Sequence, residues 1–285
     1  MKHLAMLACL LALSAPAWAS DHGPVFGYAT PVNSQGEFSF DTGLFGRHGS
    51  LGTQFSTGSQ IGYGLTPHLT FTAFVPAMFG SGSLPETRIY PGGEWAASAS
   101  WRFFHSVTQV GKRLEATGTL GIVVPGPQTD SGVLGSLHRA PGIGSSLAAG
   151  VASRSHYFWV GGGYTWFPEA DNTRRPSTTS WSTVYGYRPA RLRRGYDQWD
   201  YRGLVEFTGE HTSPVRLQGM DVPNSTSTSM WLGPAILAIF KDVAIEGGVQ
   251  GPVFRDVSES VYGRESIRFA INFSYLKYSS RTSTH

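Results

Sequence analysis

The chain has one cysteine, few charged residues and no helical periodicity beyond its first residues. Cys9 lies in an N-terminal apolar run, so the rest of the chain has no thiol for a disulfide framework or a thiol-based metal site. Charged residues make up 14% of the 285 residues, whereas a soluble domain is typically about 25% charged. The net charge of +3 is small and no basic stripe with stacking aromatic residues occurs, so nucleic acid is not an expected partner. This composition indicates little water-facing surface.

The first residues have the order of a secretory signal peptide. A charged start, MKH, is followed by the apolar run LAMLACLLALSAP and by Ala17-Trp18-Ala19 before Ser20. The run is shorter than the ~20 residues that a membrane-spanning helix needs, so a retained anchor is the weaker alternative. We expect residues 1–19 to be a cleaved signal and residues 20–36 to form a periplasmic or plug segment.

Apolar residues recur at every second position over most of the remaining chain. In LGTQFSTGSQIGYGL, residues 51–65, the large apolar residues fall on odd positions and the even positions hold Gly, Ser and Gln. A two-residue period is typical of a β-strand. It is found in ten segments between Phe38 and Tyr275, and residues 69–79, which are apolar on both faces, make an eleventh expected strand. The sequence therefore predicts an all-β protein.

The connections between these segments alternate between short turns and long polar loops. Tight turns are expected at LTPH, SRSH and KD, which are residues 65–68, 153–156 and 241–242. Long loops rich in Gly, Pro and Ser are expected at 80–93, 126–141 and 212–227. Strand direction alternates consistently only if TSWSTVYGYRP, residues 179–189, is a further strand. We then expect about 12 strands, with long loops on one side and short turns on the other, as in outer-membrane barrels.

The second face of each strand separates a membrane barrel from a secreted β-sandwich. A soluble sandwich buries its apolar face and exposes charged residues on the other, but here the second face carries Gly, Ser, Ala and Gln. In a membrane barrel the apolar face contacts lipid and small residues fit the lumen. Aromatic residues near strand ends would form interfacial girdles; these are Phe79, Trp95, Phe104, Tyr157, Trp166, Phe167, Trp181, Trp199, Trp231, Phe254 and Tyr275. We predict a closed antiparallel transmembrane β-barrel over residues 37–278, with outer-membrane lipid as a partner and a β-sandwich as the alternative.

The same alternation assigns polar side chains to the lumen. The candidates are Asp41, Gln54, Gln60, Glu94, Arg102, Glu115, Asp200, Arg202, Glu206, Glu210, Glu246, Gln250, Arg264, Arg268 and Asn272. They either line a polar passage that selects solutes by charge or pair across the lumen, and the sequence leaves both interpretations open. Glu206, Glu210 and Glu246 are expected to set a weak preference for cations, because their strands bring few arginines. Twelve strands lie between a filled barrel and an open pore, so we expect a narrow conduit with free space beside residues 52–64.

No catalytic constellation stands out. His211 with Ser213 is the nearest approach to a nucleophile and its base, but no G-x-S-x-G elbow is present. The nine histidines show no metal-ligand spacing, so no metal or cofactor is expected.

Four segments resemble a known barrel family. They are YGLTPHLT (63–70), VYGYRP (184–189), WDYRGLVEFTGEHT (199–212) and IEGGVQGPV (245–253). They are similar to an outer-membrane barrel family labelled transporter, putative MetA-pathway of phenol degradation. The resemblance covers most of the mature chain. It implies passage of organic compounds and carries over no functional residues.

Barrels of this type commonly end on an aromatic residue, whereas here the terminal strand SIRFAINFSYLKY is followed by a tail, residues 279–285. The tail departs from the C-terminal end by which the barrel-assembly machinery usually recognises such barrels. We predict a passive or facilitated channel for small solutes, aromatic or hydrophobic ones among them. The alternatives are a structural or adhesive surface barrel and a lipid-modifying enzyme.

Overall fold

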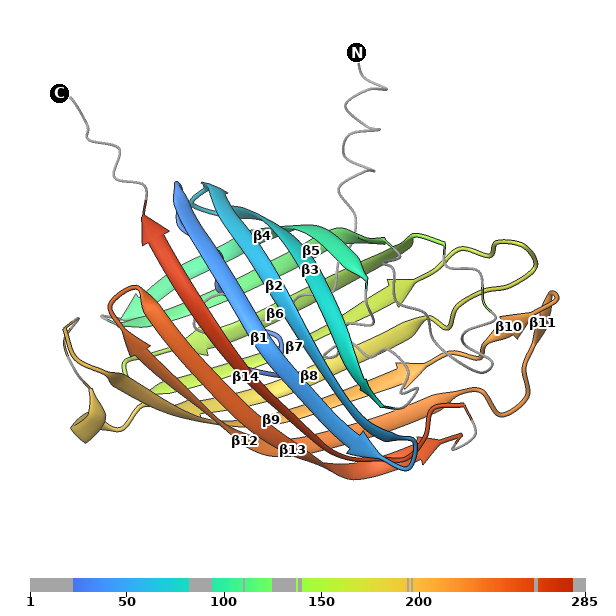
Figure 1. The fold of residues 1–285 in the computed structure, drawn as a ribbon. Coiled ribbons are helices and arrows are strands. Elements are labelled where there is room, and N and C mark those ends of the chain that lie inside the picture. The colour runs from blue at the N-terminus through green and yellow to red at the C-terminus, as the bar shows by residue number, and fades with distance from the viewer. Residues whose placement is uncertain are drawn as a thin grey trace, which may run out of the picture.

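A closed antiparallel barrel of twelve strands forms the molecule (Figure 1). The computed structural model describes residues 23–81, 94–109, 111–124, 137, 140–193, 195, 197–258 and 261–278. The barrel strands are β1 (Glu37–Gly49), β2 (Gly52–Thr66), β3 (Leu69–Ser81), β4 (Trp95–Gln109), β5 (Lys112–Val124), β6 (Gly142–Ala152), β7 (His156–Trp166), β8 (Thr178–Tyr187), β9 (Asp200–Thr212), β12 (Ser227–Phe240), β13 (Val243–Val257) and β14 (Glu265–Tyr278). The predicted fold is confirmed, including the strand added between residues 168 and 197 to complete the alternation.

Neighbours along the chain pair in order, and β1 closes the barrel by pairing with β14. Outside the barrel wall, β10 (Arg216–Leu217) and β11 (Met220–Asp221) form a small hairpin. A short 3-10 turn, η1 (Ala190–Leu192), lies between β8 and β9. No helix among the described residues is long and apolar enough to cross a membrane. The expected signal, residues 1–19, and the C-terminal tail lie outside the described residues.

The connections are long at one end of the barrel and shorter at the other, as predicted, with one exception. We call the end with the connections 82–94, 125–141, 167–177, 213–226 and 258–264 the long-loop end, and the opposite end the short-turn end. The prediction that every connection at the long-loop end is long is wrong for β1 and β2, which are joined by Ser50 and Leu51 alone. Gly52 has a φ of 112°, which residues with a Cβ rarely adopt, and it closes this tight turn.

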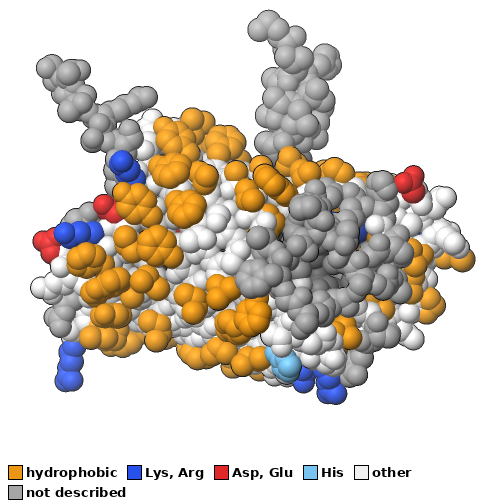
Figure 2. All heavy atoms as spheres, viewed as in Figure 1, with side chains coloured by type: hydrophobic (Ala, Val, Ile, Leu, Met, Phe, Trp, Pro, Cys, Tyr) orange, Lys and Arg blue, Asp and Glu red, His pale blue; other side chains and the backbone are white. Residues whose placement is uncertain are grey.

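Apolar side chains cover the outer wall. Figure 2 shows them over most of the visible wall, with charged side chains at its margins. Trp101 is 60% exposed and Leu147 is 63% exposed, each near the middle of its strand. Along β2 the even positions from Gln54 to Gly64 are buried in the lumen and the odd positions face outward, as the alternation predicts. The molecule is thus apolar outside and polar inside, the reverse of a soluble protein.

Three aromatic residues depart from the predicted girdles. Tyr157, Phe167 and Trp231 are buried rather than on the outer wall. Their positions near strand ends suggested an interface, but their alternation with outward-facing neighbours places them inward. The side chain of Phe79 lies outside the described residues. Trp95, Trp166 and Trp199 are exposed, as expected of girdle residues.

The seam between β3 and β4 is the shortest ladder in the wall. The two strands pair over residues 69–74 and 96–101, whereas β1 and β2 pair from Phe38 to Gly49. A register shift between Arg102 and Phe104 then reverses the alternation of β4. As a result, His105 lies opposite Glu115 rather than outside.

Candidate functional site

Residues 23–36, which we call the plug, lie inside the barrel and cross its lumen before entering β1. Gly23 to Tyr28 are all buried. The plug contacts inward-facing residues of β9, β8, β5 and β3 in that order. The candidate site is therefore the lumen together with this segment.

Glu206 of β9 holds the buried end of the plug. Its carboxylate accepts hydrogen bonds from the backbone N–H groups of Val25, Phe26 and Gly27, at 2.8, 2.7 and 2.8 Å. The side chain is fully buried, so these bonds replace the water that a carboxylate requires. Gly27 is needed for close approach, because a Cβ there would lie 2.3 Å from Cγ2 of Val184.

Tyr28 packs on glycines of β7 and hydrogen-bonds serines of β8. Its N–H donates to Ser182 Oγ at 2.8 Å, and its hydroxyl pairs with Ser180 Oγ. A Cβ on Gly161 would lie 2.5 Å from Tyr28 Cβ, and one on Gly163 would lie 2.4 Å from the Tyr28 hydroxyl. The glycine run of β7 thus makes room for the plug.

The remainder of the plug lies against β5, β2 and β3. Thr30 donates to Glu115 at 3.2 Å, and the Asn33 N–H donates to Thr70 Oγ1 at 2.8 Å. A Cβ on Gly64 would lie 1.9 Å from the Ser34 carbonyl oxygen. The plug therefore occupies part of the space that we expected to remain beside residues 52–64, and it accounts for glycine on that face.

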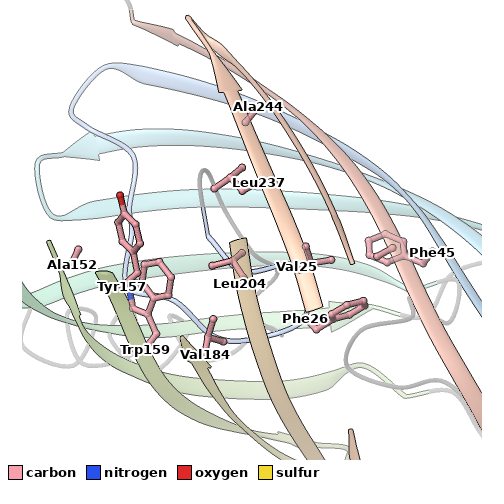
Figure 3. Close-up of a cluster of buried hydrophobic side chains, with 12 residues drawn as sticks. Val25, Phe26, Phe45, Ala152, Tyr157, Trp159, Val184, Leu204, Leu237 and Ala244 are labelled. Carbon is pink, nitrogen blue, oxygen red and sulfur yellow. The ribbon is translucent and has the colours of Figure 1, made fainter. Parts of the chain in front are cut away.

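The plug also completes an apolar cluster within the lumen (Figure 3). Phe26 and Val25 belong to this cluster, whose other members come from β1, β6, β7, β8, β9, β12, β13 and β14. Phe26 rests on Gly248, where a Cβ would lie 2.8 Å from its ring. Polar bonds orient the plug, and this cluster adds the burial that favours its bound state.

A network of charged residues lies in the lumen near the long-loop end. Arg268 donates to Glu265 at 2.6 Å and to Glu210 at 2.5 Å. Its guanidinium lies 4.0 Å from the centroid of the Trp231 ring. Arg47 adds a contact of 3.8 Å with Glu265. The residues that make these contacts, namely Arg268, Glu265, Glu210, Trp231 and Arg47, belong to the wall or to its rim.

Further ion pairs lie nearer the short-turn end. Arg102 pairs with Glu115 at 3.0 Å. Asp200 forms ion pairs with Arg188 at 2.6 Å and with Arg202 at 3.3 Å. The arginines of the lumen are thus largely engaged by acids close to them, in agreement with the pairing interpretation that the sequence left open.

The outer wall carries an apolar hollow of about 770 Å³. It lies over β4 to β7, beside the last residue pair of the short β3–β4 seam. Gly118 lies in its floor, and its rim includes Trp101, Leu120, Leu147 and Tyr164.

No protein-family model matches the chain, and no curated protein matches it. Among solved structures it is similar to the COG4313 outer membrane channel from Pseudomonas putida F1, with a TM-score of 0.62 and 11% identity, covering 90% of this chain and 100% of that one. It is also similar to the NanC porin, with a TM-score of 0.50 and 8% identity, covering 83% and 98%. At such identities the shared property is the fold.

The structure places most of the predicted lumen residues inside the barrel. Buried ones are Asp41, Gln54, Gln60, Glu115, Asp200, Glu206, Glu210, Glu246, Gln250 and Arg268, and partly buried ones are Glu94, Arg102, Arg202 and Asn272. Arg264 is not among them, because it is exposed in the connection before β14. Glu210 was expected to lack an offsetting charge because its own strand brings few arginines, but Arg268 of β14 binds it.

Sequence reasoning missed Arg47, Glu265 and the residues of the plug. Arg47 follows the same alternation as Asp41 along β1, so the two-residue period is the signal that could have found it. Glu265 lies across a register shift at the end of the β1–β14 ladder, so simple alternation from Arg268 puts it on the wrong face. The plug has no periodicity that predicts its contacts.

The suggested catalytic pair is not joined. His211 hydrogen-bonds Thr228 at 2.8 Å, and Ser213 Oγ accepts from the Ser177 N–H at 2.8 Å. No hydrogen bond connects His211 with Ser213 among the described residues. Among the described residues, no three acids, histidines or cysteines are grouped so as to hold a metal ion.

Proposed function

We propose that the protein is an outer-membrane channel for small solutes and that the plug controls passage through its lumen. The observation that carries this proposal is the bond set of Glu206. The Glu206 carboxylate belongs to the wall, and it accepts hydrogen bonds from backbone N–H groups of the plug. The plug in turn crosses the lumen. When the segment leaves, water can solvate both sides and a polar path remains.

The membrane location rests on the outer wall. A closed barrel leaves no unpaired sheet edge in lipid, and the wall is apolar along its length. The expected signal peptide would take the chain across the inner membrane. The barrel-assembly machinery would then insert it, with the tail as an addition after the last strand.

The class of solute is proposed from the outer wall and from the sequence resemblance. The hollow at Gly118 is apolar and opens toward the side that faces lipid. Together with the resemblance to the MetA-pathway barrels, this supports aromatic or hydrophobic solutes as cargo.

Conductance of the full-length protein in planar bilayers tests the plug. Replacing residues 25–30 by a Gly-Ser sequence of equal length keeps the backbone N–H groups but removes the Val25 and Phe26 side chains from the cluster and the Tyr28 side chain from β8. The plug should then bind less tightly, and mean conductance should increase several-fold. The matched control replaces residues 216–221, the β10–β11 hairpin, in the same way and should conduct like wild type. Equal conductance of the two replacements would show that the plug is not the barrier.

Absence of conductance and of solute uptake into liposomes for all three proteins would favour a structural or adhesive barrel. Cleavage of phospholipid that is lost on changing His211 or Ser213 would favour an enzyme.

Gly118→Leu tests the class of solute. A Cβ at Gly118 would lie 3.4 Å from Leu147, so the side chain fits and fills the hollow. Uptake of a hydrophobic dye into liposomes should fall, with ion conductance unchanged. Gly203→Leu, on the outer wall with no atom within 4 Å of its Cβ, is the control. Unchanged dye uptake by Gly118→Leu would show that hydrophobic solutes do not pass through the hollow.

A further inference from the structure

Basic side chains gather at the short-turn end of the barrel. Lys112, Arg154 and Arg191 are exposed there. Among the described residues, none of these three side chains takes part in an ion pair. Lys241 pairs with Asp197 at 3.7 Å, but both side chains are so exposed that the pair contributes little. We call Lys112, Arg154, Arg191 and Lys241 the basic arc.

Contacts between neighbouring turns bring the arc together. A Cβ on Gly111 would lie 2.8 Å from Arg154 Cγ, so Arg154 packs beside the residue that precedes Lys112. Arg193 donates a hydrogen bond to Ser155 Oγ, so the connection that carries η1 lies against the turn that carries Arg154. The partner of Lys241 belongs to this same connection. Figure 1 shows η1 at the end of the barrel opposite the β10–β11 hairpin.

Exposed aromatic side chains mark the membrane interface beside the arc. Trp199 and Tyr201 are exposed at the start of β9, and Trp199 stacks on Phe240 of β12 with ring centroids 5.3 Å apart. Tryptophan and tyrosine concentrate where lipid headgroups meet hydrocarbon. Phe240 directly precedes Lys241, and Leu192 of η1 is also exposed. The arc therefore lies at the depth of the headgroups.

The exposed charges of the long-loop end are mixed instead. Asp221 and Asp256 are exposed there, and Arg216 pairs with Glu169 at 3.1 Å. In outer-membrane barrels the short turns face the periplasm. The arc is then directed at the phospholipid headgroups of the periplasmic leaflet.

We propose that the basic arc binds the phosphate groups of anionic phospholipids in the periplasmic leaflet. Guanidinium and ammonium groups form charge-assisted hydrogen bonds with phosphate oxygens, and clusters of Lys and Arg beside a membrane attract anionic lipids. The aromatic side chains next to the arc would contact the same lipids where their acyl chains begin. This binding does not depend on passage through the lumen.

Quenching of Trp199 by brominated lipid tests the proposal on the full-length protein. The protein is reconstituted into phosphatidylcholine vesicles with increasing fractions of brominated phosphatidylglycerol or, in parallel, brominated phosphatidylcholine. Subtracting the signal of Trp199→Phe isolates the quenching of Trp199. Half-maximal quenching should need a several-fold smaller fraction of the anionic lipid, and the difference should shrink as salt screens the charges. Equal half-maximal fractions in low salt would overturn the proposal.

Substitutions assign the preference to the arc. Lys112→Gln, Arg154→Gln and Arg191→Gln together should remove most of it. The matched control removes the same charge from connections at the long-loop end and should retain the preference, through Arg174→Gln, Arg216→Gln and Arg264→Gln. Because two lipids are compared within each variant, a change in stability common to both cancels. A triple variant of the arc that keeps the wild-type preference would overturn the proposal.

Two further measurements distinguish phospholipid from other sources of phosphate. Inorganic phosphate should reduce the preference no more than chloride does at equal ionic strength, and abolition of the preference by phosphate alone would indicate a site for the free anion. A stronger preference for lipid A than for phosphatidylglycerol would assign the arc to the opposite leaflet. Either result would overturn the proposal.

Conductance separates this inference from the proposed function. A lipid preference that depends on the arc, in a protein that does not conduct, keeps the lipid site and removes the channel. Conductance without a lipid preference keeps the channel and removes the lipid site.

Discussion

Two buried carboxylates of β9, Glu206 and Glu210, lie four residues apart on its inward face and are satisfied in different ways. Glu210 is bound by Arg268, a side chain of the wall, at 2.5 Å. Glu206 is bound by three N–H groups of the plug. The first arrangement lies within the wall, whereas the second joins the wall to the plug, the segment that we propose controls passage. In the proposed channel, identical residues on one strand therefore serve the scaffold and the gate.

The largest effect is expected from Arg268→Ala. It leaves Glu210 and Glu265 buried without their main partner, which typically costs 3–5 kcal/mol. The midpoint of heat-induced unfolding in detergent should fall accordingly, while conductance of the surviving barrel changes little. A large increase in conductance at unchanged stability would contradict the assignment of this network to the scaffold.

Glu206→Ala should affect the gate instead. The plug loses three charge-assisted hydrogen bonds, and a loss of about 3 kcal/mol would raise the unplugged population more than 100-fold. Open probability in planar bilayers measures this population. Glu210→Gln is the matched control on the same strand, and a similar open probability for both variants would remove the distinction between the two acids.

Gly161→Ala tests the fit between the plug and the wall. The added Cβ would lie 2.5 Å from Tyr28 Cβ, and such overpacking costs about 1–3 kcal/mol. The expected result is a smaller rise in open probability than for Glu206→Ala. Gly203→Ala, which adds its Cβ where no atom lies within 4 Å, should behave as wild type. Tyr28→Gly removes the Cβ that the new methyl group would meet, so Gly161→Ala in the Tyr28→Gly background should add little to the open probability if the clash is the cause.

The smallest effect is expected from Arg216→Ala. Its pair with Glu169, at 3.1 Å, joins partly exposed side chains outside the wall. Exposed pairs contribute about 0–1 kcal/mol. Neither the unfolding midpoint nor open probability should change measurably, and a large change in either would show that this connection takes part in the gate.

The barrel was predictable because alternation acts locally. Residues 51–65 show their inward and outward faces without any knowledge of their neighbours, and the direction rule alone required the strand at Thr178–Tyr187. Errors arose where the two-residue period is interrupted. The register shifts beside Phe104 and Glu265 reverse the faces of the residues beyond them, and no sequence signal marks either one.

The candidate site was predictable only in its wall residues. Glu206 and Glu246 were placed in the lumen by alternation, but their partners were not. The N–H groups of Val25 to Gly27 are backbone atoms, so their residue types give no sign of the contact. The glycines at Gly161 and Gly163 were visible in the sequence, and their purpose became clear only with Tyr28 against them.

The position of the plug has a consequence for the order of assembly. The barrel is complete only when β14, the last strand, pairs with β1. Hydrogen-bond partners of the plug lie on β3, β5, β8 and β9, which all precede β14 in the chain. The segment can therefore associate with the concave face of an unfinished sheet. It would then serve as an internal template for curvature, and closure of β1 on β14 would enclose it.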